Sequence, residues 1–113
     1  MNGCSAQLAQ LQRRSDDNLA EFLRIEVATG LAFAELAETE YQVGNEKVGA
    51  RSVHHVARAY STLRRFLDDT SQTGRLTGEV RQELAAGAER LKSTLDGLKA
   101  NHHRKAFTGN ENK

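Results

Sequence analysis

The chain has 113 residues, the length of one domain, and aliphatic, aromatic and cysteine residues make up 38% of it. It contains no proline and no tryptophan, which disfavours turn-rich sandwiches and barrels and leaves a core of mainly aliphatic side chains. The formal net charge of +1 excludes a strong general attraction to nucleic acid or to membrane surfaces.

The first predicted helix covers residues 18–43. Asn18 and, three residues later, Glu21 match a capping box, in which the two side chains satisfy the free amides at a helix start. Gly44 is expected to stop this helix, and Asn45 is the expected N-cap of the next one.

An earlier apolar run precedes that helix. Leu8 and Leu11 keep the same helical period, so residues 5–14 are expected either to continue the helix or to form a separate short one. The remaining alternative for residues 1–14 is a mobile segment.

The helix predicted at residues 18–43 is apolar around much of its circumference, roughly 220° at 3.6 residues per turn. One side carries Leu19, Leu23, Val27, Ala34, Ala37 and Tyr41, and the neighbouring side carries Phe22, Ile25, Phe33, Leu36 and Val43. Such a surface needs a cover. The cover is either a larger core that includes residues 5–14 folded back, or a second copy of the chain in a homodimer.

Two more helices follow, at residues 46–67 and from Thr77 onward, where Thr77 is the expected N-cap. Residues 68–79 are polar with two glycines and predict a loop, and residues 101–113 are aperiodic and predict a disordered tail. The second helix has an apolar seam of Val53, Val56, Tyr60, Leu63 and Leu67, widened by Ala57 and Phe66. The third carries Val80, Leu84, Ala88, Leu91, Leu95 and Leu98 at the same spacing. Together these patterns predict a single all-α domain over residues 1–113, an antiparallel three-helix bundle.

A strip of basic residues follows one side of the second predicted helix. It comprises Lys47, Arg51, His54, Arg58 and Arg65, which lie within about 60° of one another on a helical wheel, opposite the apolar seam. The first helix is acidic by contrast, because residues 16–46 hold eight carboxylates and one arginine. Three interpretations remain open: an ordinary solvated face that complements the acidic helix, a docking strip for an acidic protein partner, and, less favoured, a nucleic-acid contact.

Residues that could carry catalysis or hold a metal ion are not arranged for either. Neighbouring histidines on a helix, such as His54 and His55, point about 100° apart and cannot readily hold one ion. The single cysteine, Cys4, has no identifiable base beside it. We therefore expect no enzyme activity, no cofactor and no small-molecule substrate.

Residues 34–60 resemble one helical hairpin of a tetratricopeptide repeat. The matching residues are Ala34, Ala37, Tyr41, Gly44, Ala50, Ala57 and Tyr60. The resemblance covers one unit only, and it implies a closely packed hairpin and a protein-interaction role. The pattern of the whole chain is also similar to that of small bacterial helical proteins, which implies no particular function.

The sequence therefore predicts a non-enzymatic helical interaction or scaffold module that associates with itself or with a protein partner. The N-terminal segment has no continuous apolar stretch, so no secretory signal is expected. The chain also lacks a run of about 18 apolar residues, so no membrane-spanning helix is expected. One cysteine cannot form an internal disulfide, which favours a reducing compartment, and a cytoplasmic location is expected.

Overall fold

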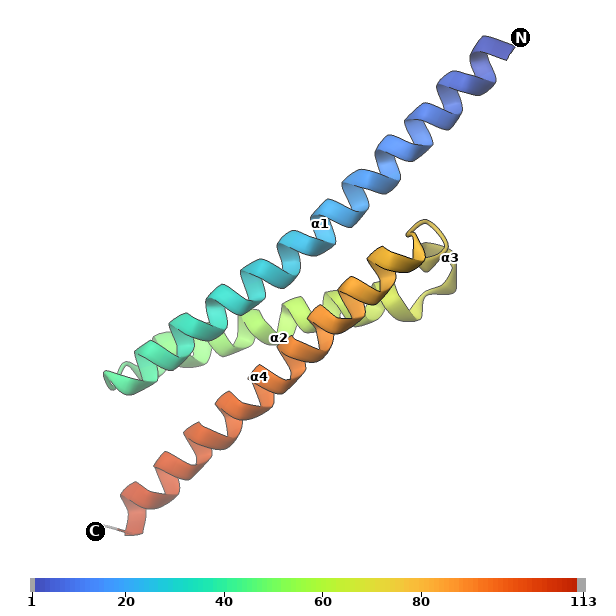
Figure 1. The fold of residues 1–113 in the computed structure, drawn as a ribbon. Coiled ribbons are helices and arrows are strands. Elements are labelled where there is room, and N and C mark those ends of the chain that lie inside the picture. Colours follow the sequence, from blue (N-terminus) through green and yellow to red (C-terminus); the bar gives the residue numbers. More distant parts are fainter. Residues whose placement is uncertain (1, 112–113) are drawn as a thin grey trace.

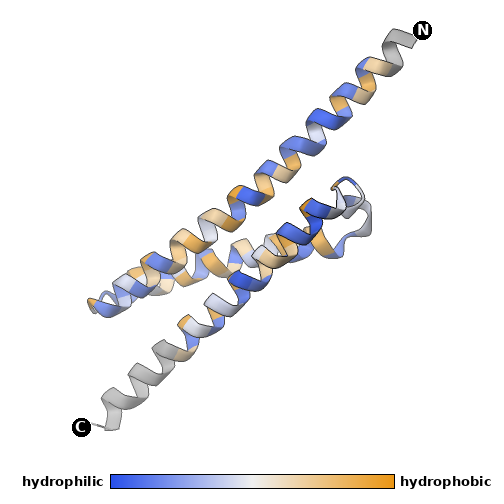
Figure 2. Cartoon of the chain, in the orientation of Figure 1, coloured by the Kyte–Doolittle hydropathy of each residue, from blue (hydrophilic) through white to orange (hydrophobic). Residues whose placement is uncertain are grey.

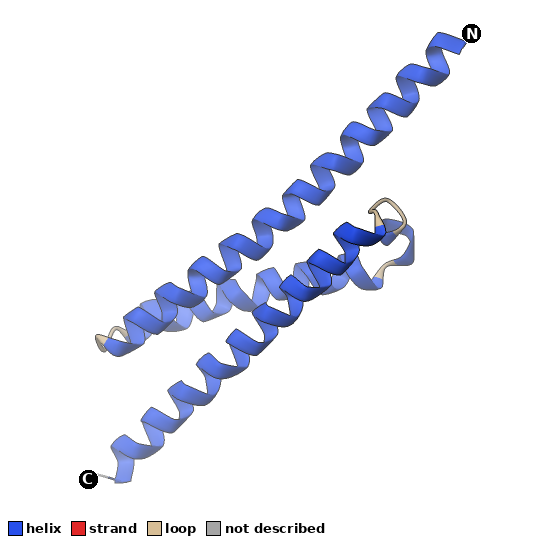
Figure 3. Cartoon of the chain, in the orientation of Figure 1, coloured by secondary structure: helices blue, strands red, loops and turns tan. Residues whose placement is uncertain are grey.

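The computed structural model describes the backbone of residues 2–111 and the side chains of residues 6–100. The described chain consists of helices and connecting turns, without strands (Figures 1 and 3). The elements are α1 (Asn2–Gln42), α2 (Glu46–Asp68), the short α3 (Thr70–Thr73) and α4 (Gly78–Glu111). Helices α1, α2 and α4 pack together, with α2 antiparallel to the other two (Figure 1). The predicted all-α, three-helix bundle is confirmed.

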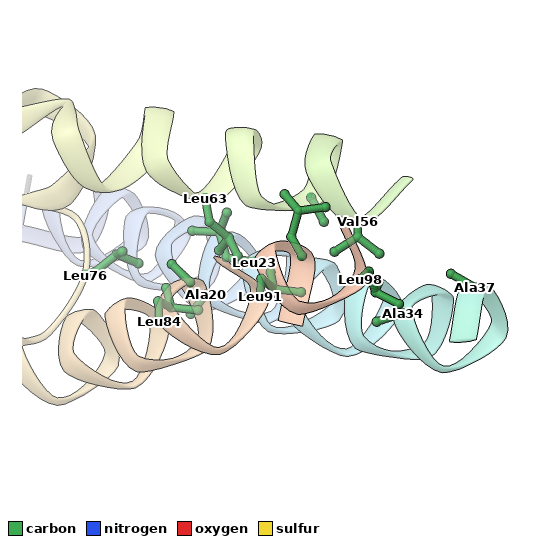
Figure 4. Packing of buried hydrophobic residues seen from close by; sticks show 13 residues of the cluster. Ala20, Leu23, Ala34, Ala37, Val56, Leu63, Leu76, Leu84, Leu91 and Leu98 are labelled. Carbon is green, nitrogen blue, oxygen red and sulfur yellow. The ribbon is translucent and has the colours of Figure 1, made fainter. Parts of the chain in front are cut away.

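The core lies along the line where the three long helices meet, and its largest fully buried side chains are leucines (Figure 4). Gly30 marks a tight part of this line where all three helices meet. A Cβ at Gly30 would lie 2.7 Å from Cδ2 of Leu91 and 3.0 Å from Cβ of Ala59, so α1, α2 and α4 approach one another closely there. The buried apolar residues are Ala20, Leu23, Ala34, Ala37, Val56, Ala59, Leu63, Leu76, Leu84, Ala88, Leu91, Leu95 and Leu98.

Helix α1 runs without a break through Asn18, so the capping box predicted at this position is wrong. The apolar period upstream of Asn18 continues that of the rest of the helix, and no glycine or proline interrupts it, so the backbone has no reason to stop. The alternative of residues 5–14 folded back onto the core is also wrong. Leu8 and Leu11 are 67% and 59% exposed.

The turn between α1 and α2 forms as predicted. Gly44 adopts a φ of +85°, a left-handed conformation that residues with a side chain rarely adopt, and the amide of Asn45 donates to the carbonyl of Glu40 at 2.8 Å. Asn45 is the N-cap of α2, although its side chain makes no capping hydrogen bond. Its carbonyl accepts from the amide of Gly49 at 3.0 Å.

The buried seam of α2 is rotated relative to the predicted one. The buried residues are Gly49, Ser52, Val56, Ala59 and Leu63, whereas Val53, Tyr60 and Leu67 are only half-buried. Small residues occupy this seam because α1 and α2 lie close together. A Cβ at Gly49 would lie 2.5 Å from the ring of Tyr41. Burial beside α2 raises the pKa of the Tyr41 hydroxyl.

The connection from α2 to α4 contains more helix than predicted, because the four residues of α3 lie where a loop was expected. Asp69 explains it. Its Oδ1 accepts from the amide and the hydroxyl of Ser71 at 3.0 and 2.7 Å, and these hydrogen bonds lower the pKa of the Asp69 carboxyl. Thr77 is confirmed as a cap at the start of α4, because its Oγ1 accepts from the amide of Val80 at 3.2 Å.

The bundle is extended, with principal extents of 78 × 21 × 17 Å. The beginning of α1 projects past the α2–α4 connection, and the end of α4 projects in the opposite direction (Figure 1). Helix α4 continues to Glu111, so the backbone is helical over most of the segment predicted to be a disordered tail. Residues 112–113 of that segment, and all of its side chains, lie outside the described part of the chain.

Candidate functional site

Apolar side chains lie exposed along the side of α1 that faces away from the bundle. Phe22, Ile25, Leu36 and Val43 are 47%, 54%, 40% and 71% exposed, and we call these four residues the outer face of α1. Phe22, Ile25 and Leu36 lie on a helix whose opposite side is largely buried, and Val43 follows that helix directly. Soluble proteins seldom leave several large apolar side chains along one side of a helix open to water without a partner.

Phe33 was grouped with the outer face by sequence, and the structure places it at the edge. Its side chain is half-buried, and its ring stacks on the imidazole of His55 with a centroid distance of 4.3 Å and an interplanar angle of 19°. Phe33 therefore joins α1 to α2. The neighbouring His54 is exposed and belongs to the basic strip.

The apolar series of α1 continues beyond the bundle (Figure 2). We call residues 2–14 the overhang, since every described side chain in residues 6–14 is exposed. It carries the exposed Leu8 and Leu11. Sequence reasoning noticed the helical period of these leucines but did not assign them to a site. No other part of the described chain packs against them.

Arg75 fixes the point at which the overhang begins. Its guanidinium donates to Oδ1 of Asp16 at 2.9 Å, to Oγ of Ser15 at 2.8 Å and to Oε1 of Gln72 at 3.3 Å. This half-buried arginine ties α1 to the connection before α4. Sequence reasoning did not identify this cluster, because Asp16 and Ser15 lie 59 and 60 residues from Arg75 in the chain and no local pattern links them.

A second cross-helix ion pair lies between α1 and α4. Nε and Nη2 of Arg24 donate to the two carboxylate oxygens of Glu83 at 2.8 and 3.0 Å, which is a bidentate arrangement. These hydrogen bonds hold the pKa of the Glu83 carboxyl below its ordinary value. Both side chains are about half exposed, so the pair contributes little to stability.

The basic strip lies fully on the surface. Each of its five members, Lys47, Arg51, His54, Arg58 and Arg65, is exposed, and among the described residues none of them forms an ion pair. The neighbouring Arg64 is different, because it pairs with Asp68 at 2.6 Å. Among the described residues, the carboxylate of α1 that forms an ion pair is Asp16, and its partner is Arg75 in the connection before α4, so the strip is not neutralised by the acidic helix through direct contacts.

The described residues hold neither a cluster of metal ligands nor a helix that could span a membrane. Within residues 6–100, no three His, Cys, Asp or Glu side chains gather closely enough to hold a metal ion. None of the described helices is both long enough and apolar enough to cross a bilayer.

Comparison with models of protein families, with curated proteins and with solved structures finds no match. The candidate functional surfaces of the chain are therefore the outer face of α1 and the basic strip.

Proposed function

We propose that this chain is a non-enzymatic helical interaction module that associates with itself through the outer face of α1. The observation that carries the proposal is the exposure of four large apolar side chains along one side of α1, between 40% and 71%, while Leu23, Ala34 and Ala37 on the opposite side are buried. Isolated apolar residues on a surface need no explanation, whereas several on one side of one helix indicate a contact.

The packed hairpin of α1 and α2 supports the same proposal. Ala34 and Ala37 are buried, and Gly49 lies directly against Tyr41, so the two helices form a rigid support for the outer face. Rigid presentation of an apolar row lowers the entropy lost on association. The resemblance to a tetratricopeptide-repeat hairpin is in keeping with this role.

The proposal is tested by sedimentation equilibrium of the intact chain and of the Leu36→Glu variant. We expect about twice the monomer mass of 12.5 kDa for the intact chain, and the monomer mass for the variant, because the new carboxylate would have to be buried in the interface. Far-ultraviolet circular dichroism should remain helical in both, since Leu36 lies outside the core.

The matched control is Ala9→Glu, which adds the same charge at an exposed position of α1 on the far side of the helix from Leu11. It should leave the dimer mass unchanged. A monomer mass for the intact chain at high micromolar concentration would reject self-association.

We propose the basic strip as a second contact surface, for an acidic protein segment. Five exposed side chains without ion pairs in the described chain support this assignment. The test is binding of a fluorescent polyglutamate peptide at low salt, which the triple variant Arg51→Glu, Arg58→Glu and Arg65→Glu should abolish. Absence of peptide binding at low salt rejects the strip as an acidic-partner site.

Nucleic acid is the second candidate ligand of the same strip, because regularly spaced cations also match a phosphate backbone. The near-neutral charge of the chain counts against it. Binding of duplex DNA that falls steeply with salt and exceeds peptide binding would reverse the order of the two candidates.

We propose a cytoplasmic location. The single cysteine and the absence of a bilayer-spanning helix among the described residues support this location. A fusion to a fluorescent protein that matures in reducing compartments gives the test, and accumulation outside the cytoplasm contradicts it.

A further inference from the structure

The exposed side of α1 follows a strict seven-residue repeat. Starting at Leu8, steps of three and four residues reach Val43, the first residue after α1, and every position on this path is exposed. We call these positions the outer seam: Leu8, Leu11, Ser15, Asn18, Phe22, Ile25, Thr29, Ala32, Leu36, Thr39 and Val43. A spacing of three and four is the pattern of the a and d positions of a coiled coil, and this one is sustained over about five heptads.

The buried side of α1 follows the same repeat on the other side of the helix. Ala20, Leu23, Gly30, Ala34 and Ala37 are buried, and they occupy the b and f positions when the outer seam is given a and d. The bundle therefore buries one seven-residue series and leaves the other exposed, and within it Ser15 accepts a hydrogen bond from Arg75. Because the exposed series has coiled-coil spacing, the partner that it fits is a long helix with the same spacing.

The charges beside the outer seam disfavour a parallel pair of α1 helices. In a parallel coiled coil, each g position faces the e position five residues later in the second helix. That arrangement sets Glu21 against Glu26 and Glu35 against Glu40, and symmetry repeats each repulsive contact on the other side. These carboxylates of α1 therefore oppose this orientation.

An antiparallel pair removes these repulsions in one register. When Phe22 faces Ile25 of the second copy, Arg14 faces Glu35 and Glu21 faces Ala28, so the pair gains attractive contacts without a like-charge contact at the g positions. A shift by one heptad in one direction sets Glu21 against Glu35 of the second copy. The opposite shift sets Glu21 against its own counterpart.

The polar positions of the outer seam select the same register. Asn18 faces Thr29 of the second copy, which places two hydrogen-bonding side chains in one layer, and Leu11 faces Leu36. A polar pair within a coiled-coil seam fixes register, because a shift by one heptad in either direction sets Asn18 against Leu36 or Phe22 of the second copy and buries its amide against an apolar side chain.

We infer that α1 pairs with α1 of a second copy as an antiparallel coiled coil centred between Leu23 and Arg24. This inference rests on the proposed self-association and adds its orientation and register. It also accounts for the overhang. Leu8 and Leu11 project past their own bundle and lie against Thr39 and Leu36 of the second copy, which the bundle leaves exposed.

The test is cross-linking with a short bismaleimide in a Cys4→Ser background. Leu11→Cys and Leu36→Cys are made as two single variants and as one double variant. In the antiparallel dimer the two Leu11→Cys thiols lie about 37 Å apart, from 25 residues at 1.5 Å each, so neither single variant should cross-link to itself. The double variant and a mixture of the two single variants should form covalent dimers.

The outcomes separate the two proposals. Self-cross-linking of each single variant overturns the antiparallel register and leaves self-association intact. A dimeric mass for the reduced double variant without any cross-link overturns the outer seam as the interface. A monomeric mass for the intact chain overturns both the proposed function and this inference.

Discussion

The two sides of α1 have similar apolar content and opposite surroundings. On the inner side, Leu23 and Ala37 are completely buried, whereas on the outer side Ile25 is 54% exposed, only two residues from Leu23. Folding orders the backbone of α1 at a cost in conformational entropy, but in the isolated bundle only the inner side gains the free energy of apolar burial. This difference teaches that the sequence of α1 specifies two contacts, one within the chain and one outside it.

The largest effect is expected when one apolar side chain on each side of α1 is shortened to alanine. Leu23→Ala should lower the free energy of unfolding by about 2–5 kcal/mol, because it opens a cavity in the core. Ile25→Ala should leave the isolated bundle nearly as stable and weaken self-association at least about tenfold, a change of about 1.4 kcal/mol. Urea unfolding at one fixed low concentration and sedimentation at several concentrations measure the two effects. Equal loss of bundle stability in both variants would show that the two sides are not distinct.

A smaller effect is expected when alanine replaces a glycine, either at the tight centre of the bundle or on its surface. Gly30→Ala should lower the unfolding free energy by about 1 kcal/mol, since overpacking against Leu91 and Ala59 exceeds the gain in helix propensity. Gly97→Ala should raise it by up to about 1 kcal/mol, because no atom lies within 4 Å of the added Cβ. Thermal unfolding gives both signs, and stabilisation by Gly30→Ala would mean that the three helices lie farther apart.

The boundary between the bundle and the overhang is tested by Asp16→Asn. Loss of the carboxylate removes the ion pair with Arg75, and we expect a decrease of about 0.5–1 kcal/mol in the unfolding free energy. Asp17→Asn is the matched control, because Asp17 is exposed and forms no ion pair among the described residues. If both variants lower the free energy of unfolding in urea equally, the Arg75–Asp16 ion pair does not hold α1 against the connection before α4.

The smallest effect concerns the Arg24–Glu83 pair between α1 and α4. Since its pKa is lowered by folding, the Glu83 carboxylate adds stability above its unfolded pKa, near 4.5, and this stability is lost as the pH falls through the lower folded value. Glu83→Gln should therefore reduce the fall in melting temperature between pH 5 and pH 3. Glu79→Gln, at an exposed position without an ion pair in the described chain, should leave that fall unchanged.

Local signals in the sequence predicted the helix ends where backbone conformation decides them. Gly44 and Thr77 lie at such ends, and both predictions are confirmed. Asn18 had the same kind of signal and was wrong, because a capping side chain favours a helix start but does not end a helix that approaches from upstream. The rotated seam of α2 was missed since glycine, serine and alanine carry little hydrophobic signal, although they allow the closest approach of α1.

The sequence predicted which side of a helix is exposed, but it did not predict which residues of other helices that side contacts. A helical wheel placed the basic strip correctly on the surface, because opposite sides of one helix follow from spacing alone. It did not reveal that Phe33 stacks on His55 or that Arg75 contacts Asp16. These contacts join separate helices, and their positions depend on packing across the whole bundle.

The central claim is that a second copy covers the outer side of α1, including the overhang. Hydrogen–deuterium exchange of peptides within residues 6–14, at protein concentrations below and above the association midpoint, tests it most directly. The account predicts slow exchange at high concentration and fast exchange at low concentration, with Leu36→Glu fast at both. Fast exchange of these amides at every concentration, beside a protected core in α2 and α4, would contradict it.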